Sequence, residues 1–420
     1  MKQNRDHITV FEHQTIKLNQ VIDDVTFDEN RFKALENYYG DQGVPYFSLI
    51  NKGIRFNEYV GVIQIGNTLI EVLPKADKND SDEGKGKWRN ILIGMLKAVG
   101  SFDIKATSNS NLKIKPNTIL DLYFELFINE VEYLVHNGLI KQYRKKEGNV
   151  TALKGNLQFS KHIQQNLTHQ ERFYVRHSTY DVEHKLHFIL YKTIRLLKNI
   201  NTNTTLHSRI GSLLLLFPEM PDIKVTEATF EKIIYTRKNL AYKKSIDIAK
   251  LLLLQYHPDL SKGRNHVLAL MFDMNVLWEQ FVYISLRKNK ESDTTVKEQV
   301  KKYFWKPEHG TRSYMKPDIV IQKDNNKCVV LDTKWKNLNG YNPSPEDLRQ
   351  MYVYHQYFDA KKVALIYPGE NPFIAGHYLD PKTQDKTNIE CSTIFLSANP
   401  NIKEWQKSIH TSILDWSKTS

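Results

Sequence analysis

Two acidic residues and a lysine interrupt the apolar strands of the segment MKPDIVIQKDNNKCVVLDTKWK, residues 315–336. The runs DIVI and CVVLD, joined by the polar turn QKDNNK, predict a β-hairpin. Asp318 opens the first run, while Asp332 and Lys334 close the second. In an antiparallel pair the two acids lie opposite or diagonal to each other, within roughly 5–8 Å. Asp332 and Lys334 are two residues apart and therefore project from the same face of their strand, so we expect three charged groups on one patch. Asp324 is a turn former and is left out of the candidate site.

Converging carboxylates repel each other unless a cation neutralises them. Mg²⁺ does this through one or two carboxylates while keeping several waters. A charged lysine is not a metal ligand, but it can hold a metal-bound water or a phosphate and stabilise developing negative charge. These are the parts needed for metal-assisted phosphodiester hydrolysis. The alternative is structural, because a PD pair often starts an edge strand and DxK arises by chance in a lysine-rich chain.

The overall charge is basic. The formal net charge is +12, from 59 Lys and Arg against 47 Asp and Glu, which favours a polyanionic partner such as nucleic acid over charge kept only for solubility. Basic and aromatic residues interleave in residues 300–316, just before the hairpin. The residues predicted to contact phosphates there are Lys301, Lys302, Lys306, Arg312 and Lys316. An amphipathic strand pair with solvated lysines is the alternative.

The bulk composition is that of a soluble globular protein, with 40% apolar and 25% charged residues. No uncharged apolar run approaches the ~18–20 residues that cross a bilayer, and the N-terminus lacks a secretory h-region. Two cysteines, Cys328 and Cys391, are too few for a disulfide framework. These features predict a cytoplasmic protein without a membrane segment.

The chain is predicted to be α/β and multidomain. Residues 1–75 look β-rich with a hairpin turn at Gly66-Asn67, residues 75–87 form a charged surface loop, and two helical stretches follow. KQYRKKEGNVTALKGN, residues 141–156, is a basic, turn-rich break before a mostly helical stretch at 180–255. The predicted domains are a β-rich and helical N-terminal domain at 1–155, a mostly helical connecting region at 156–260 and a C-terminal domain at 261–420.

The last third of the chain has a distinctive order of elements. A helix carrying Glu279 precedes the strands of the hairpin, and SPEDLRQMYVYHQYF predicts a further helix before the strand KKVALIYP. A terminal helix follows, with Asn401 as its N-cap. This order and the PD…LDTK motif resemble the PD-(D/E)xK nuclease superfamily, a restriction-endonuclease-like fold.

The resemblance implies roles for individual residues. Asp318 and Asp332 would be metal ligands, Lys334 the catalytic lysine, and Glu279 in LWEQF an additional metal ligand. Gln350 and Tyr354, four apart on one helical face, look like the QxxxY motif of the RecB-like branch. The alternatives are that Glu279 is a solvated helix residue and Tyr354 a core aromatic.

Three longer stretches resemble the McrC family, namely YVGVIQIGNTLIEVLPK, LMFDMNVLWEQFV and VVLDTKWK. The resemblance implies a Mg²⁺-dependent endodeoxyribonuclease subunit of a McrBC-like, type IV restriction system. Its implied partners are a hexameric McrB-like AAA+ GTPase, which binds the GTP, and double-stranded DNA carrying 5-methylcytosine-type modification. The N-terminal region would dock on the ring and stimulate GTP hydrolysis. The chain itself has no GxxxxGK[ST] loop, in keeping with this division of labour.

Several alternatives stay open. The chain could serve a related system that cuts a specific unmodified sequence, or act as a non-catalytic activator of an AAA+ ring. The 75–87 loop and KQYRKKEG are exposed candidates for the contact with the ring. Asp181, His184 and His187 in DVEHKLH have helical spacing that could bind zinc, but without a further ligand the pattern favours a core helix.

Overall fold

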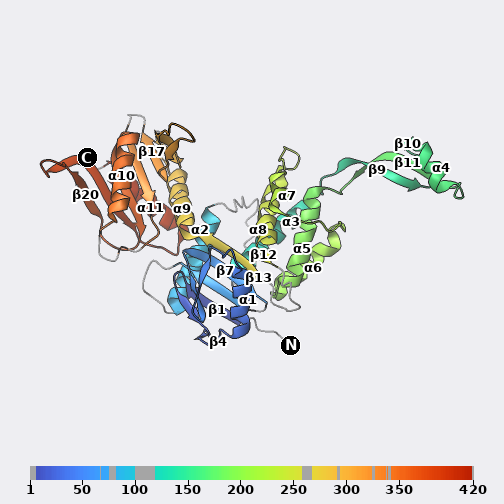
Figure 1. Cartoon of the computed structure of the whole chain (residues 1–420), viewed down its shortest axis with the longest axis horizontal. Coiled ribbons are helices and arrows are strands. Elements are labelled where there is room, and N and C mark those ends of the chain that lie inside the picture. Colours follow the sequence, from blue (N-terminus) through green and yellow to red (C-terminus); the bar gives the residue numbers. More distant parts are fainter. Residues whose placement is uncertain are drawn as a thin grey trace. The chain divides into compact units, whose positions relative to one another are not determined.

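The structure, a computed structural model, describes residues 6–66, 68–74, 82–99, 119–257, 267–290, 294–323, 327–336, 338 and 342–418. The chain forms two compact units, unit 1 from residues 1–113 and 271–420 and unit 2 from residues 114–270. In Figure 1, unit 1 is blue and orange to red, and unit 2 is green to yellow. The predicted mixed α/β class is confirmed.

The two units do not coincide with the three predicted domains at 1–155, 156–260 and 261–420, because residues from both ends of the chain pack into unit 1. The predicted boundaries stay predictions. In the described part of the chain, no helix has the length and apolar character needed to cross a membrane.

The N-terminal segment of unit 1 is built on three strands. β1 (Asp6–Phe11) pairs parallel with β8 (Thr68–Leu73), which pairs antiparallel with β7 (Tyr59–Ile65). Gly66 has a φ of 54°, a left-handed conformation that favours glycine, and it lies in the predicted hairpin turn; Asn67 is outside the described residues. The shorter strands of this segment are β2 (Thr15–Lys17), β3 (Val21–Ile22), β4 (Val25–Thr26), β5 (Phe47–Ile50) and β6 (Gly53–Phe56).

Two helices of this segment differ from the sequence prediction. α1 (Glu29–Tyr39) was not predicted, although Asp28 is its N-cap and accepts a hydrogen bond from Arg31 N at 2.9 Å. α2 (Asp82–Ala98) includes residues 82–87, so the predicted surface loop is wrong there, and residues 75–81 lie outside the described residues. Within this turn of the helix, Lys85 Nζ pairs with Asp23 Oδ1 at 2.6 Å.

Unit 2 is mostly helical, as predicted for residues 180–255. β13 (Val267–Asp273) then carries the chain into unit 1. The helices are α3 (Ile119–His136), α4 (Phe159–Asn166), α5 (Lys185–Ile200), α6 (Thr204–Leu216), α7 (Glu227–Glu231), the 3₁₀ turn η1 (Leu240–Tyr242) and α8 (Lys243–Leu254). The strands are β9 (Gln142–Val150), β10 (Asn156–Leu157), β11 (Phe173–Asp181) and β12 (Tyr256–His257).

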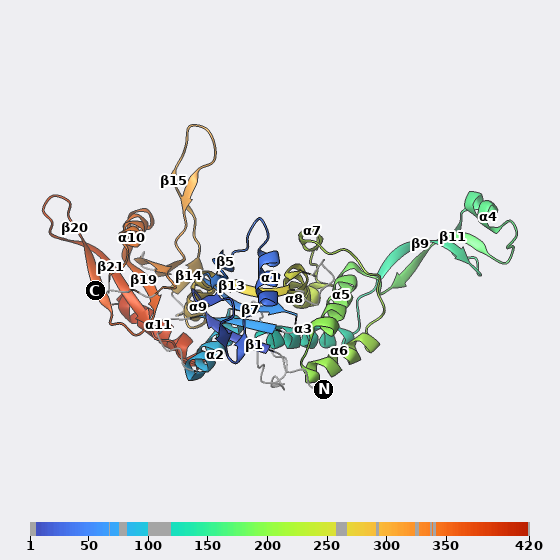
Figure 2. The same ribbon diagram turned by 60° about the horizontal axis from the view of Figure 1, so that its bottom comes forward.

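The predicted turn-rich break at residues 141–156 is wrong, because most of it is a strand. β9 pairs antiparallel with β11 along its whole length, and the ribbon extends from the helices of unit 2 with α4 at its far end (Figures 1 and 2). We call β9, β10, α4 and β11 the arm. A two-stranded ribbon meets solvent on both faces, so it tolerates a strand as charged as QYRKKEGNV. Arg144 and Lys146 are neutralised by Asp181 and Glu183.

The histidines of DVEHKLH have structural roles, in keeping with the core-helix interpretation. His184 caps α5, its Nδ1 accepting a hydrogen bond from Leu186 N at 3.1 Å. His187 is fully buried, with Nδ1 beside Val182 O and Nε2 2.9 Å from Tyr242 Oη. Asp181 pairs with the cations of β9 instead.

The C-terminal segment of unit 1 is a six-stranded sheet, and the predicted order of its helices and strands is confirmed. The strands lie in the order β14 (Thr294–Glu298), β17 (Ile319–Lys323), β18 (Lys327–Thr333), β19 (Ala360–Pro368), β21 (Lys386–Leu396) and β20 (Ile374–Leu379). β17 and β18 form the predicted antiparallel hairpin, whereas β18, β19 and β21 run parallel.

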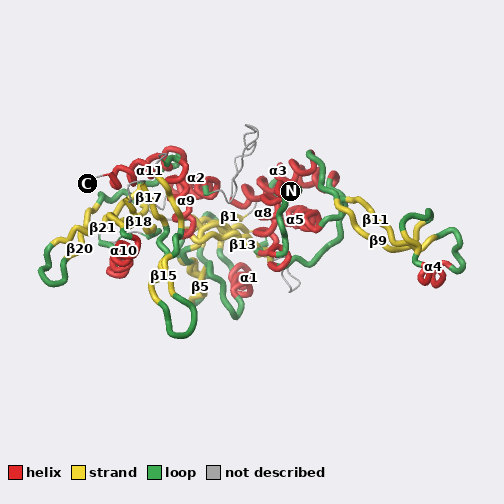
Figure 3. Tube along the Cα trace, turned by 90° about the horizontal axis from the view of Figure 1, so that it is seen from above, coloured by secondary structure: helices red, strands yellow, loops and turns green. Residues whose placement is uncertain are grey.

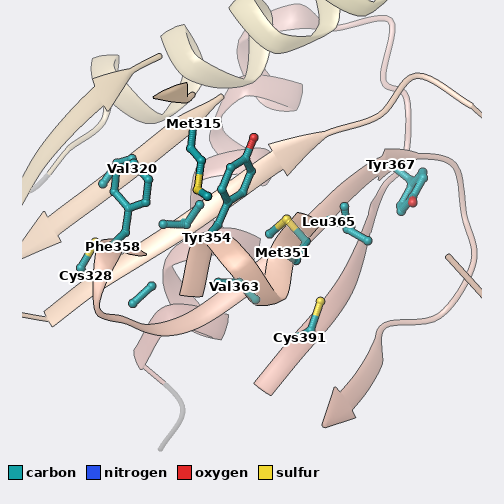
Figure 4. Close-up of a cluster of buried hydrophobic side chains, with 12 residues drawn as sticks. Met315, Val320, Cys328, Met351, Tyr354, Phe358, Val363, Leu365, Tyr367 and Cys391 are labelled. Atoms are coloured by element: carbon teal, nitrogen blue, oxygen red, sulfur yellow. The ribbon is translucent and has the colours of Figure 1, made fainter. Parts of the chain in front are cut away.

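Helices cover both faces of this sheet. α10 (Pro345–Phe358) lies on one side, and α9 (Met274–Lys288) and α11 (Ile402–Lys418) pack on the other, as Figure 3 shows for α10 and α11. Met351, Tyr354 and Phe358, spaced along one helical face, pack on the strands in the cluster of Figure 4. Each large side chain buried in this way contributes roughly 1.5–3 kcal/mol. On the other face the rings of Phe281 and Trp405 pack at a tilt of 48°, with centroids 4.7 Å apart.

The two segments of unit 1 meet at a group of tryptophans. Trp335, just after β18, is 8% exposed and lies with its ring 5.4 Å from that of Trp278 and 6.3 Å from that of Trp88. Its indole Nε1 donates a hydrogen bond to Glu12 Oε1 at 2.7 Å, and Glu12 is 6% exposed. A residue near the C-terminal hairpin is thereby fixed to the start of the chain.

We predict that Trp335→Phe lowers the free energy of unfolding by about 1–3 kcal/mol, because an aromatic ring remains but the hydrogen bond to the buried Glu12 is lost. The measurement is guanidinium unfolding of the whole chain. The matched control is Trp305→Phe, at an indole that is 57% exposed, which should stay within about 0.5 kcal/mol of the unsubstituted chain. Equal stabilities of the two variants would contradict the prediction.

A second prediction concerns acid stability. Burial lowers the pKa of His187 to about 4, below the ordinary value of about 6.5 that it regains on unfolding. The unfolded chain therefore binds more protons between these values, and stability should fall by at most about 3 kcal/mol as the pH drops through this range.

Thermal midpoints between pH 7 and 4.5 test this expectation. His187→Gln, which keeps hydrogen-bonding groups but takes up no proton, should show a shallower decline than the unsubstituted chain. His207→Gln, at an exposed histidine of α6, is the control, and its thermal midpoint should decline as steeply as that of the unsubstituted chain. Parallel curves for His187→Gln and the unsubstituted chain would rule out His187 as the titrating group.

Candidate active site

The register of β17 and β18 brings the two predicted acids together. Ile319 pairs with Leu331, so the next positions outward are Asp318 and Asp332, directly opposite each other. Val320 and Val330, two residues inward on each strand, lie in the cluster beneath α10. Because residues two apart share a face, both acids belong to the face that α10 covers. The strand register therefore brings Asp318 and Asp332 together across the hairpin, as predicted.

Asp332 is a buried carboxylate with a cationic partner. It is 2% exposed, its Oδ2 lies 2.6 Å from Lys334 Nζ, and Gln350 Nε2 donates to its Oδ1 at 3.5 Å. Burial, followed by the negative charge of Asp318, raises the pKa of Asp332 to about 7. The ion pair with Lys334 therefore does not offset the cost of burying this carboxylate beside Asp318.

Lys334 is held between acids. Besides Asp332, its Nζ lies 3.9 Å from Asp347 Oδ1. Burial opposes its charge, but the neighbouring carboxylates of Asp332, Asp347 and Asp318 outweigh this effect and raise the pKa of Lys334. The side chain is 25% exposed. Lys334 is therefore a fixed cation that remains accessible from solvent.

Asp318 is oriented by the strand opposite. Its Oδ2 accepts hydrogen bonds from Thr333 N at 2.7 Å and from Thr333 Oγ1 at 2.8 Å. Its backbone oxygen accepts one from Gln299 N at 2.9 Å. The residue between Asp332 and Lys334 therefore positions the other acid of the pair.

The predicted pair on α10 also reaches the site. Gln350 Nε2 donates to Tyr354 Oη at 2.7 Å as well as contacting Asp332. Tyr354 is 6% exposed and packs in the core beneath the helix, so it is a core aromatic whose hydroxyl faces the site. Burial raises its pKa to about 12, so the hydroxyl stays protonated.

Asp347 was missed by the sequence analysis. Asp347 Oδ2 forms an ion pair with Lys336 Nζ at 2.6 Å. Burial opposes the ionisation of Asp347, but hydrogen bonds with Lys336 and Ser344 outweigh it and lower the pKa of this carboxyl. The sequence signal that could have found it is the N-cap residue Ser344. In the structure Ser344 caps α10, and its Oγ accepts a hydrogen bond from Asp347 N at 3.1 Å. The cap fixes the helical phase and places Asp347 one turn before Gln350.

Glu279 lies on α9 and connects to the site through a second missed residue. Gln299 Nε2 donates to Glu279 Oε1 at 2.8 Å, and Lys316 Nζ donates to Gln299 Oε1 at 3.3 Å. Burial, followed by the negative charge of Asp318, raises the pKa of Glu279, so the two carboxylates interact electrostatically. Gln299 has a φ of 48° after β14, a conformation that its sequence context does not signal.

The donor set suits a hard divalent cation in part. Asp318 and Asp332 oppose each other, and burial, followed by the charge of Asp318, raises the pKa of Asp332, so a bound cation would stabilise its ionised form. Among the described residues, no group of three or more His, Cys, Asp or Glu side chains is arranged to hold a metal. The two aspartates thus fit a metal site, and Glu279 as a further ligand stays a prediction.

The predicted phosphate-binding residues divide into two groups. Lys301, Lys302, Lys306 and Arg312 are exposed on or beside the hairpin of β15 (Lys302–Trp305) and β16 (Ser313–Met315). Lys316 is half-buried and belongs to the network of Glu279 and Gln299. Their contacts with DNA stay predictions.

Comparisons with known proteins agree with the resemblance described above. Residues 54–368 match the family model described as McrBC 5-methylcytosine restriction system component. A chain from a structure of Thermococcus gammatolerans McrB AAA+ hexamers with bound McrC aligns with a TM-score of 0.71 and 21% identity, covering 98% of this chain and all of that one.

A chain of the cryo-EM structure of the Thermococcus gammatolerans McrBC complex aligns with a TM-score of 0.49 and 20% identity, covering 67% of this chain and 88% of that one. The search of curated proteins found no match. The likeness in structure concerns the fold, whereas the family model spans most of the chain. The chain therefore belongs to the family of McrBC 5-methylcytosine restriction system components.

Proposed function

We propose that this chain is the nuclease subunit of a McrBC-type restriction system, with a PD-(D/E)xK-type active site in the C-terminal segment of unit 1. The observation that carries the proposal is the opposed pair Asp318 and Asp332 with Lys334 Nζ 2.6 Å from the buried Asp332. Metal-assisted hydrolysis of a phosphodiester needs these groups, and the chain's net charge of +12 suits a DNA substrate.

Each residue of the site has a distinct task in this proposal. Asp318 and Asp332 would hold Mg²⁺, with Glu279 as a candidate further ligand. A bound Mg²⁺ would polarise the phosphate and lower the pKa of a water that it holds. Lys334 lies where its charge stabilises the negative charge that grows on the phosphate oxygens. These groups need no reorganisation during the reaction because they are already fixed by their neighbours.

The supporting residues keep the reacting groups in place. Thr333 orients Asp318 through two hydrogen bonds, and Gln350, itself fixed by Tyr354, contacts Asp332. Asp347 forms an ion pair with Lys336 and also lies 3.9 Å from Lys334 Nζ, which it helps to hold in place. Loss of such supporting contacts lowers activity by misplacing the reacting groups.

The proposed partner is a McrB-like AAA+ GTPase hexamer. The Thermococcus gammatolerans structure contains McrB AAA+ hexamers with bound McrC, and this chain aligns over 98% of its length. We propose that the ring binds GTP, that this chain stimulates its hydrolysis, and that assembly licenses cleavage of double-stranded DNA with 5-methylcytosine-type modification. KQYRKKEG, on β9 of the arm, stays a candidate contact with the ring.

Substitution of the reacting groups is the direct test. With partner, GTP and Mg²⁺ present, Asp332→Ala and Lys334→Ala should each slow DNA cleavage by at least about a hundredfold, because each removes a group that acts in the transition state. Stimulation of GTP hydrolysis should be retained. Lys361→Ala, at an exposed lysine of β19, is the control and should cleave normally. Cleavage at the normal rate by either active-site variant would refute the assignment.

Metal binding by the chain alone separates a nuclease from a non-catalytic activator of the ring. In calorimetric titration with Mg²⁺ or Mn²⁺, Asp318→Asn should bind at least about tenfold more weakly than the unsubstituted chain. The control Asp359→Asn keeps the left-handed cap of α10, where asparagine is well tolerated, and should bind normally. Equal binding by Asp318→Asn would favour the activator.

The pH adds a second readout to the same titration. Because the pKa of Asp332 is raised to about 7, the apo site holds a proton below this pH that a metal must displace. Affinity should therefore rise between pH 6 and 8, with proton release on binding. Affinity that does not change over this interval would show that Asp332 does not titrate there.

A further inference from the structure

The hairpin of β15 and β16 exposes an unusual number of aromatic side chains. Tyr303 is 63% exposed, Phe304 46%, Trp305 57% and Tyr314 45%. Figure 2 shows β15 standing out from the rest of the segment. Large exposed aromatic surface in a protein marks a binding site for another molecule. We call Tyr303, Trp305 and Tyr314, with the cations Lys301 and Arg312, the aromatic platform.

The hairpin has one anchored side. Lys302 Nζ donates to Tyr357 O at 2.9 Å and lies 4.7 Å from the centre of the Phe358 ring. Phe304 contacts Tyr357, with ring centroids 6.3 Å apart. These contacts fix the hairpin to the end of α10, so the platform is held by a rigid element of the fold.

The other side carries aromatic rings flanked by cations. Tyr303 and Tyr314 face each other across the two strands, with ring centroids 6.3 Å apart. Lys301 Nζ lies 4.6 Å from the centre of Tyr314, and the Arg312 guanidinium 5.7 Å from that of Tyr303. No ion pair to Lys301 or Arg312 forms among the described residues. Their charges are therefore available to a ligand.

This combination suits unpaired nucleotides. Bases stack on aromatic rings whatever their sequence, and neighbouring lysines and arginines contact the phosphates. In a paired duplex the faces of the bases are covered by their neighbours, so a tyrosine platform gains little from it. Tyr, Trp and Arg are also enriched at protein interfaces, whereas Lys is depleted there, so a protein partner is the alternative that the test must separate. The chain's net charge of +12 also favours a polyanion.

The platform lies close to the candidate active site along the chain. Tyr314 precedes Asp318 by four residues, so their Cα atoms are at most about 14 Å apart even in a fully extended chain. This distance corresponds to about four base-pair steps of DNA. A strand held on the platform therefore passes within a few nucleotides of Asp318.

We propose that the aromatic platform binds unpaired bases of the DNA strand whose phosphodiester is presented to Asp318 and Asp332. The second half of this statement rests on the proposed function, whereas the binding of unpaired bases does not. The substrate at the moment of cleavage is then locally unpaired DNA, with the platform holding bases out of the stack.

Binding without metal tests the platform apart from cleavage. The full chain, in EDTA and at constant salt, is titrated into fluorescent oligo-dT of 20 nucleotides and into a paired duplex of equal length. Tyr303→Leu and Tyr314→Leu should each weaken binding of oligo-dT by about 10- to 100-fold, and of duplex by less than about threefold. Tyr303→Phe and Tyr314→Phe keep the ring and should bind oligo-dT nearly as the unsubstituted chain does.

The arm supplies a matched control. Tyr143 and Tyr180 form another exposed cross-strand pair, with centroids 4.7 Å apart, on a ribbon whose Arg144 and Lys146 are paired with acids. Tyr143→Leu should leave binding of oligo-dT unchanged. Circular dichroism and thermal midpoints confirm that each variant is folded.

The possible outcomes differ in what they refute. If the leucine variants bind oligo-dT normally, or lose oligo-dT and duplex equally, the platform does not stack on unpaired bases. If they bind DNA normally but fail to stimulate the partner's GTPase, the platform is a protein contact and the inference is overturned. Selective loss of oligo-dT by a chain that never cleaves DNA would support the platform and contradict the proposed nuclease.

Discussion

The hydrogen bond from Trp335 to Glu12 fixes the short segment on which the candidate site depends. Successive side chains alternate in direction along an extended chain, so the position of Trp335 also sets that of Lys334 and Lys336. Trp335 turns into the tryptophan group shared with the start of the chain, while its two neighbours form ion pairs with Asp332 and Asp347. A slip of one residue would exchange these directions and bury a lysine where Trp335 now lies.

The electrostatics of the site follow from this arrangement. Asp318, Asp332 and Asp347 lie around one half-buried lysine, and Lys336 compensates only the last of them. The pKa of Asp347 is lowered and that of Asp332 is raised, although both are aspartates close to Lys334. Burial and the opposing Asp318 account for the difference. The site thus holds negative charge that its own lysines do not cancel, which is the condition for binding a cation.

Sequence reasoning located those parts of the site that depend on local periodicity. The hairpin, the opposition of Asp318 and Asp332, and the shared helical face of Gln350 and Tyr354 all follow from spacings of two and four residues. Gln299 and the bond from Trp335 to Glu12 depend on contacts between segments distant in sequence, which no local pattern encodes. α1 and β9 were missed because their polar residues resemble loops, whereas caps and cross-strand ion pairs stabilise them.

The two exposed ribbons differ in whether nearby acids neutralise their cations. Both carry a cross-strand tyrosine pair and cations, so their composition alone does not distinguish them. On the arm, Arg144 and Lys146 form ion pairs with Asp181 and Glu183. A nucleic acid would have to displace these acids before it could bind the two cations. On the hairpin of β15 and β16, Lys301 and Arg312 lie over tyrosine rings, whose weak attraction leaves most of their charge to a phosphate. Because β16 ends three residues before Asp318, a nucleic acid held by this charge would lie near the acids of the candidate site.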